Sequence, residues 1–133
     1  VAQKPAKPLA FYFLRQGQKR RWFFGLPGNP GAVMIAFEEY VRPLIKKVSG
    51  HENFWPVEIE ASLTGPVKKK GGRLNFLRVN LENKNGEWLA RPLGKQESGM
   101  MTSFRMTRGL ALIPAEAEFL PEGTKVKVHL VEW

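Results

Sequence analysis

The stretch at residues 25–31, which reads Gly-Leu-Pro-Gly-Asn-Pro-Gly, constrains the fold of this chain more than any other. An apolar, aromatic run ends just before it. After it, apolar residues recur at spacings of three and four from Ala32 to about Val48, which predicts an amphipathic helix. A strand, a tight turn and a helix are therefore expected in succession. Such a unit points backbone N–H groups and the positive end of the helix dipole at one place, which suits an oxyanion.

Single residues in and after this turn predict where the helix begins, bends and ends. Asn29 is a suitable N-cap, and Pro30 suits the first helical position. Pro43 lacks the backbone N–H that a helix interior uses, so we expect a kink near residues 40–42. Gly50 is expected to end the helix, because glycine accepts the left-handed backbone found there.

The residues before the turn predict a β-hairpin. Residues 9–15 and 20–24 are rich in aromatic side chains, and the polar residues 16–19 between them suit a turn. The first run is continuously apolar rather than alternating, which favours a strand that is buried on both faces. Ahead of it, two prolines make residues 1–8 extended chain. That segment presents two lysines, which fit either an anion clamp or a solvated terminal arm.

Composition narrows the class of partner. The chain has 133 residues and a net charge of +9, which favours anionic partners such as nucleic acid, phosphorylated small molecules or acidic proteins. A merely soluble basic surface explains the charge as well. The absence of Cys excludes disulfides and thiolate metal sites, and two His residues are too few for a zinc site. No apolar run approaches the roughly 20 residues of a membrane span.

The second half of the chain has a different pattern. Residues 51–56 carry no periodicity, which places a domain boundary there. Beyond them, short alternating segments predict strands of a small β-barrel or sandwich. Asn85-Gly86 predicts a type I′ hairpin turn. Residues 100–106 are ambiguous; Ser103 is a candidate cap for a short helical turn, and the Met and Phe side chains there are expected to fill core space.

Five ordered elements of the chain resemble one family. Residues 25–30, followed by 37–43, closely resemble the Gly-Leu-Pro-Gly-Asn-Pro turn and the F-x-x-F-V-x-P helix end of the molybdopterin molybdenumtransferases, the family of MoeA and the E domain of gephyrin. Upstream, residues 4–9 look like that family's K-P-G-K-P-L loop. Three further segments are similar to elements of its C-terminal β domain: 70–78, 98–110 and 120–126. The resemblance spans essentially the whole chain.

The resemblance implies a fold in two parts. Residues 1–50 would be the C-terminal end of an α/β molybdopterin-binding domain, namely its last β-hairpin and helix. Residues 51–133 would be an all-β, barrel-like C-terminal domain similar to domain IV of MoeA. The family's acidic Mg²⁺-binding elements would lie upstream, and the chain lacks an initiator Met. We therefore expect a fragment that is inactive alone.

The resemblance also implies a function. The parent enzyme would insert molybdate into adenylated molybdopterin and release AMP with Mg²⁺, as a cytoplasmic homodimer. The family's anion-binding positions, carried over one by one, are Lys4, Lys7, Arg15, Gly25, Pro27, Gly28, Asn29 and Pro30. Lysine and arginine would donate charge-assisted hydrogen bonds to molybdate or phosphate oxygens, and the glycines would let an oxyanion approach the backbone. No catalytic residue is assigned, and no metal ligand is expected in this chain.

The sequence departs from the family pattern at two places. Ala6 stands where the family has glycine, which restricts positive φ in that loop. Gly31-Ala32 stands where the family usually has Val-Ser. If the serine hydroxyl contacts the anion in relatives, Ala32 cannot replace it; alternatively, Gly31 exposes an extra backbone donor.

Two other classes of function remain open. The lysines at 68–70 with Arg73, beside Phe76 and Trp88, could make a nucleic-acid-binding β module, although these aromatic residues fall mostly at core-facing positions. A scaffold without chemistry is the other class, since gephyrin uses this fold for protein binding. The apolar hairpin at residues 9–24 further predicts self-association of the chain.

Overall fold

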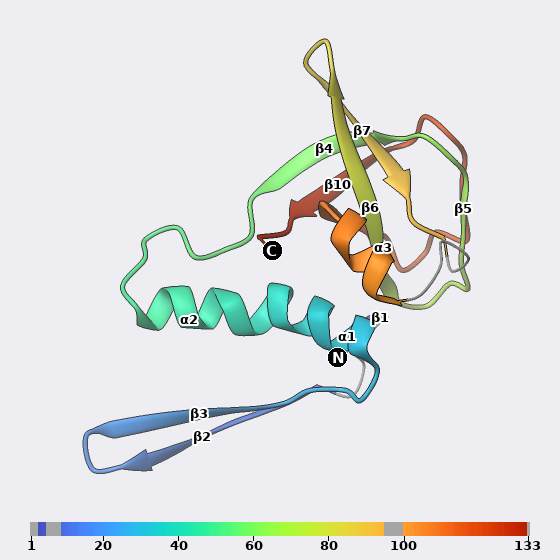
Figure 1. Ribbon diagram of the computed structural model, residues 1–133. Coiled ribbons are helices and arrows are strands. Elements are labelled where there is room, and N and C mark those ends of the chain that lie inside the picture. The colour runs from blue at the N-terminus through green and yellow to red at the C-terminus, as the bar shows by residue number, and fades with distance from the viewer. Residues whose placement is uncertain (1–2, 5–8, 95–99, 133) are drawn as a thin grey trace. The chain divides into compact units, whose positions relative to one another are not determined.

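The computed structural model describes residues 3–4, 9–94 and 100–132, and these form two compact units (Figure 1). The first unit ends at Phe54 and the second begins at Trp55, so the division falls inside the aperiodic stretch at residues 51–56. The short strand β1 (Gln3–Lys4) belongs to the second unit. Among the described residues, no helix has the length and apolarity that crossing a membrane requires.

A two-stranded antiparallel hairpin opens the first unit. Strands β2 (Ala10–Gln16) and β3 (Lys19–Gly25) pair from Ala10 opposite Gly25 to Gln16 opposite Lys19. Every residue of β2 is exposed, and the side chains at 11–14 keep 51–58% of their surface accessible. The expectation of a strand buried on both faces is therefore wrong for the described chain. The hairpin is a sheet of two strands only, so its strands pack chiefly on each other.

One continuous helical segment follows the turn. It consists of α1 (Pro30–Ala36), the π-helical turn η1 (Phe37–Val41) and α2 (Arg42–Val48). The predicted irregularity before Pro43 takes the form of this wider π turn, because proline cannot donate the hydrogen bond that would continue the α-helix. The helix ends at Val48 with Ser49 as its C-cap, and Gly50 has φ +86°, as predicted.

A buried ion pair bridges the π turn. The side chain of Glu38 is 6% exposed, and both of its carboxylate oxygens accept hydrogen bonds from Arg42. The Arg42 Nη2–Glu38 Oε1 distance is 2.7 Å. The guanidinium also lies over the Phe37 ring, 5.2 Å from its centroid. A charge that is buried in this way depends on its partner, since an unpaired carboxylate is costly away from water.

The second unit contains a five-stranded closed barrel, which confirms the predicted small barrel. Its strands follow the order β6-β7-β4-β10-β8, and β8 pairs with β6 to close the ring. These strands are β4 (Glu58–Leu63), β6 (Leu74–Lys84), β7 (Glu87–Pro92), β8 (Gly109–Ile113) and β10 (Lys125–Leu130). The pair β4–β7 is parallel, whereas the other four are antiparallel. Figure 1 shows β6 and β7 projecting together as a long hairpin.

Short strands flank the barrel. Strand β1 adds to β6 in parallel, and β5 (Val67–Lys68) pairs with β9 (Phe119–Leu120). The β6–β7 turn has positive φ at Asn85 (52°) and Gly86 (85°), which confirms the predicted type I′ turn. Alternate strand residues fill the interior: Ala61, Leu63, Val67, Val79, Ala90, Ala111, Ile113, Val126 and Val128.

A short helix, α3 (Met100–Met106), covers part of the outer side of β6. Phe104 of this helix is buried, as expected, whereas the side chains of Met100 and Met101 lie outside the described residues. The expectation that Ser103 caps a helical turn is wrong, because Ser103 lies within the helix. Its Oγ accepts a hydrogen bond from Arg78 Nη1 at 2.6 Å instead.

Two valines of the second unit give a matched test of the barrel core. Val128 is fully buried, whereas Val57 is 59% exposed. Val128→Ala is expected to lower the free energy of unfolding by roughly 2–3 kcal/mol, from about 0.8 kcal/mol per buried methylene plus a cavity term. Val57→Ala should stay within about 0.5 kcal/mol. Urea denaturation of the two variants measures the difference, and equal losses would contradict this core.

An acid-sensitive pair joins β4 to β10. The Lys127 Nζ–Glu58 Oε1 distance is 3.0 Å, and His129 Nε2 lies 3.5 Å from Glu58 Oε2. The hydrogen bond from Lys127 is the main cause that lowers the pKa of Glu58 below its ordinary value; burial opposes it, and the charges of Lys127 and His129 add to it. Because the pKa is lower in the folded state, this stabilisation is present above the unfolded pKa, about 4.3, and is lost as pH falls through the folded pKa.

The variant Lys127→Ala should therefore raise the pKa of Glu58 and reduce this acid-dependent contribution to stability. An NMR titration of the Glu58 side chain measures the shift. Lys125→Ala is the control, because Lys125 pairs with Glu60 at 3.6 Å and should leave Glu58 unchanged. An unchanged midpoint in the Lys127 variant would refute the assignment.

Candidate functional site

The stretch at residues 25–31, which we call the 25–31 turn, connects β3 to α1. Gly25 ends the strand and Pro30 begins the helix. Pro27 is buried and anchors the turn, whereas Gly28, Asn29 and Pro30 are exposed. The backbone between strand and helix is thus presented to solvent at the point where a ligand would meet the helix N-terminus.

Asn29 organises the first turn of the helix as an N-cap. Its Oδ1 accepts a hydrogen bond from the Ala32 N–H at 3.2 Å, and its carbonyl accepts one from Val33 N at 2.9 Å. Pro30 carries no N–H. Within residues 9–94 and 100–132, no acceptor pairs with the N–H of Gly31. That N–H can therefore bond to water or to an anion. The positive end of the helix dipole lies at the same place and favours an anion there.

Gly28 leaves open space beside the backbone. A Cβ built on this residue would meet no described atom within 4 Å, and its φ is not positive. Neither internal crowding nor backbone strain accounts for glycine here. Glycine at this position would instead allow a ligand to approach the backbone closely.

Ala32 bears on the departure from the family's Val-Ser pair. It is 5% exposed, so its side chain lies on the buried side of the helix start. A methyl group offers no hydrogen bond to an anion. In this chain, the donors that the turn can offer are therefore backbone N–H groups, with Gly31 the nearest to the helix start.

The structure does not bring all of the predicted anion-binding residues together. Lys4 lies in β1, but its side chain is outside the described residues, as is all of Lys7. Arg15 lies at the tip of the hairpin, where its Nε donates to the Gly17 carbonyl at 3.4 Å. From the register, Arg15 sits five residues along β2 from the pair Ala10–Gly25, about 16 Å at the usual strand rise. A contact between Arg15 and an anion at the turn stays a prediction.

Sequence reasoning missed a polar cluster on the outer side of β6. Arg78 donates to Ser103, and its guanidinium lies 4.8 Å from the centroid of the Phe104 ring. Burial lowers the pKa of Arg78. The Thr107 Oγ1 donates to the Ser103 carbonyl at 2.8 Å, and Asn80 donates to the Met106 carbonyl at 2.8 Å. The available signal in the sequence was the position of Arg78 next to the apolar Val79, because neighbouring strand residues point to opposite faces.

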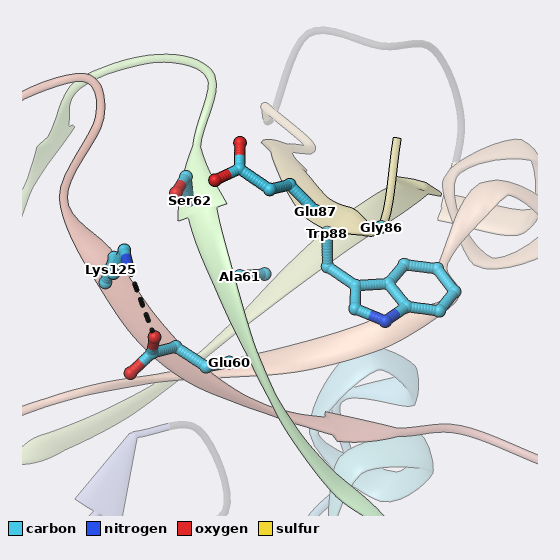
Figure 2. Close-up of a pocket in the computed structure, with 7 residues that line it drawn as sticks. All are labelled: Glu60, Ala61, Ser62, Gly86, Glu87, Trp88 and Lys125. Carbon is cyan, nitrogen blue, oxygen red and sulfur yellow. Dashed lines mark ion pairs between the residues drawn. The ribbon is translucent and has the colours of Figure 1, made fainter. Parts of the chain in front are cut away.

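A hollow of ≈ 150 Å³ lies where β4 and β7 diverge (Figure 2). Figure 2 shows Trp88 beside Ala61, and Glu87, which comes from the same strand as Trp88, points toward Ser62. The one lysine among the residues that line this hollow, Lys125, is paired with Glu60. The carboxylates near Trp88 make this a poor place for a phosphate backbone.

Metal ligands are not grouped in the described part of the chain. Among residues 3–4, 9–94 and 100–132, no set of three or more His, Cys, Asp and Glu side chains could hold a metal ion. The donor set around the 25–31 turn is one of amide N–H groups and an asparagine, which suits anions. The described residues therefore do not fit Mg²⁺.

Comparison with known proteins gives one consistent result. Residues 60–131 match the family model described as "MoeA C-terminal region (domain IV)". The chain is 32% identical over 131 residues to a molybdopterin molybdenumtransferase of Haemophilus influenzae, covering 97% of this chain and 31% of that protein. It is 31% identical over 108 residues to one of Bacillus subtilis, covering 81% and 25%. The chain thus spans about a third or less of these relatives.

The same similarity holds for solved structures. A MoeA protein of molybdopterin biosynthesis from Pyrococcus horikosii superposes with a TM-score of 0.79 at 34% identity. That alignment covers 99% of this chain and 31% of the other. It extends over both units, so the hairpin, the turn and the barrel all have counterparts there.

Proposed function

The chain belongs to the MoeA family, and on that premise we propose that it forms part of an enzyme that inserts molybdate into adenylated molybdopterin and releases AMP. The observation that carries the proposal is the 25–31 turn, where Asn29 caps a helix and the Gly31 N–H is left to a ligand. Molybdate and the pterin phosphate are both oxyanions, and this arrangement suits them.

Within this proposal, the turn positions an anion and does no proton transfer. Backbone N–H groups at the helix start would hold oxygens of molybdate or of the phosphate, and Gly28 would allow them close to the chain. Lys4, Lys7 and Arg15 would add positive charge as the anion arrives. Magnesium belongs to the proposal only through residues outside the described ones, so no step is derived through it.

The parent protein is further proposed to be a cytoplasmic homodimer, with residues 1–50 completing an α/β domain. The exposed aromatic side chains of β2 and β3 support the second part, because a two-stranded ribbon is marginally stable in water without further cover. Residues 51–133 would be its β domain. The fragment alone is expected to be inactive.

Full-length protein with adenylated molybdopterin tests the function against the scaffold alternative. The transferase reading expects binding of the nucleotide and release of AMP when molybdate and Mg²⁺ are added. A protein that binds the nucleotide yet releases no AMP would support a scaffold instead.

The nucleic-acid alternative loses support from the basic loop. Lys69 Nζ donates to the carbonyls of Arg73 and Ala115, both at 3.1 Å, so this lysine holds the loop together. Lys68 lies over the Phe119 ring at 5.9 Å. Tight binding of generic single-stranded DNA with a steep salt dependence would revive that alternative.

A further inference from the structure

The tip of the β6–β7 hairpin presents an Asn-Gly pair to solvent. Asn85 and Gly86 are the two central residues of the type I′ turn, and both are exposed. A Cβ built on Gly86 would meet no described atom within 4 Å, so the space around this residue is open. Because Gly86 has no side chain, nothing hinders contact between its backbone nitrogen and the side chain of Asn85.

An asparagine in such a place can react with the nitrogen that follows it in the chain. The Gly86 nitrogen loses its proton and attacks Cγ of Asn85. A new C–N bond forms, the bond from Cγ to the side-chain nitrogen breaks, and ammonia leaves. Water then opens the cyclic imide at either carbonyl, which gives aspartate or isoaspartate at residue 85. Water is the only co-reactant, and asparagine is accordingly one of the thermolabile residues.

A hydrogen bond inside the turn opposes this reaction. The Gly86 N–H donates to Oδ1 of Asn83 at 3.2 Å. The proton that must leave is therefore held by Asn83, and the nitrogen is directed toward Asn83 rather than toward Cγ of Asn85. The strand pairs that end with Lys84 opposite Glu87 further limit how far the turn can move.

We propose that Asn85 is a site of spontaneous deamidation and that Asn83 sets its rate. The proposal goes beyond the transferase function and does not depend on it. In the folded chain the reaction is slow, because it waits for the bond between Gly86 and Asn83 to open. When the hairpin opens, the nitrogen is released and the reaction speeds up. The amount of aspartate and isoaspartate at residue 85 thus records the time that the hairpin has spent open.

The two products differ in their effect on the barrel. Aspartate accepts the left-handed backbone of residue 85, where φ is 52°, much as asparagine does, so the turn is kept. Isoaspartate lengthens the backbone at the point that sets the register of β6 against β7. It is expected to loosen the pairs nearest the turn, Lys84–Glu87 and Asn83–Trp88. Hydrogen exchange of the amides of β7 measures this loss.

The composition of the chain allows a direct test. All 12 acidic residues are glutamate, so any aspartate that appears on ageing comes from asparagine. The 133-residue chain is kept for weeks in warm, mildly alkaline buffer and is then analysed by peptide mass spectrometry and with a protease that cuts before aspartate. We expect slow conversion of residue 85 and new cleavage after Lys84. The other asparagines precede proline or a residue with a side chain and should react more slowly.

Variants of the turn separate the role of Asn83 from general exposure. Asn83→Ala should raise the rate at Asn85 roughly 2- to 10-fold, as expected for losing a hydrogen bond worth about 0.5–1.5 kcal/mol. Asn83→Asp keeps an acceptor oxygen and should keep the slow rate. Lys84→Ala is the matched control, because Lys84 is exposed in the same hairpin and its side chain is not part of that bond. Its rate should stay within about twofold of the wild type.

Concentrated urea gives the second half of the test. Unfolding removes the bond between Gly86 and Asn83, so the wild type and Asn83→Ala should then react at the same, faster rate. Equal rates of these two proteins in the folded state would overturn the proposal. Faster conversion of another asparagine, or an unchanged residue 85 in the folded wild type, would overturn it as well. None of these results involves AMP release, so the transferase function is tested separately.

Discussion

Replacing Gly28 by alanine is expected to lower molybdate-dependent AMP release by the full-length protein by roughly 10²- to 10³-fold, the usual effect of losing one oxyanion contact. The reason is steric. A methyl group on this exposed residue would occupy the space through which an oxyanion reaches the backbone of the 25–31 turn. Initial rates of AMP release for the two proteins, at saturating nucleotide, measure the effect.

The folded state should tolerate this change, which separates activity from stability. A Cβ at Gly28 meets no described atom within 4 Å, so the free energy of unfolding should change by less than about 0.5 kcal/mol. Gly65→Ala is the matched control, because its Cβ also enters open space in the second unit. AMP release at the wild-type rate by the Gly28 variant would show that the 25–31 turn does not bind the anion.

The second large effect is on stability. Arg42→Ala is expected to lower the free energy of unfolding of the first unit by about 3–5 kcal/mol, because Glu38 would be left as a buried carboxylate without its partner. Hydrogen exchange of the amides of α1 and α2 reports this unit separately from the barrel.

Two further variants separate the ion pair from simple loss of packing. Arg42→Lys keeps the charge but loses the two-pronged contact with Glu38, so its cost should be smaller. Glu38→Leu combined with Arg42→Leu should recover most of the loss, because two apolar side chains leave no buried charge. A cost below about 1 kcal/mol for Arg42→Ala would mean that the pair behaves like an exposed one.

Local features of the fold could be predicted from the sequence. The cap at Asn29, the disturbance before Pro43 and the type I′ turn at Asn85-Gly86 depend on one or two residues each, and the structure has all of them. Strand alternation also predicted a small β-barrel or sandwich, and the structure has the barrel. These features share one cause, since backbone chemistry and period-two burial are visible within a few residues.

Long-range features could not be predicted. Closure of the barrel depends on the pairing of β6 with β8, and no short segment encodes which strands meet. A continuous apolar run at residues 9–15 indicated burial but not the covering partner, so the exposure of Phe11 and Phe13 was missed. The role of Ser103 was missed in the same way, because its partner Arg78 lies 25 residues earlier.

The position of the candidate site in the sequence could be predicted, but the spatial arrangement of its residues only in part. The 25–31 turn does present backbone donors at a helix start, with Asn29 as its organising residue. The register of the hairpin, however, places Arg15 at the tip of the hairpin, at the opposite end from the 25–31 turn. The hairpin turn predicted at residues 16–19 sets this register, with Gln16 opposite Lys19.

The most direct test of the central claim is the molybdate dependence of AMP release by the full-length wild-type protein. Adenylated molybdopterin and Mg²⁺ are supplied, molybdate is varied, and AMP is quantified together with the molybdenum retained by the pterin product. AMP is expected to appear only when molybdate is present, with one AMP for each molybdenum inserted. Release of AMP at the same rate without molybdate, or bound nucleotide with no release at any molybdate concentration, would contradict it.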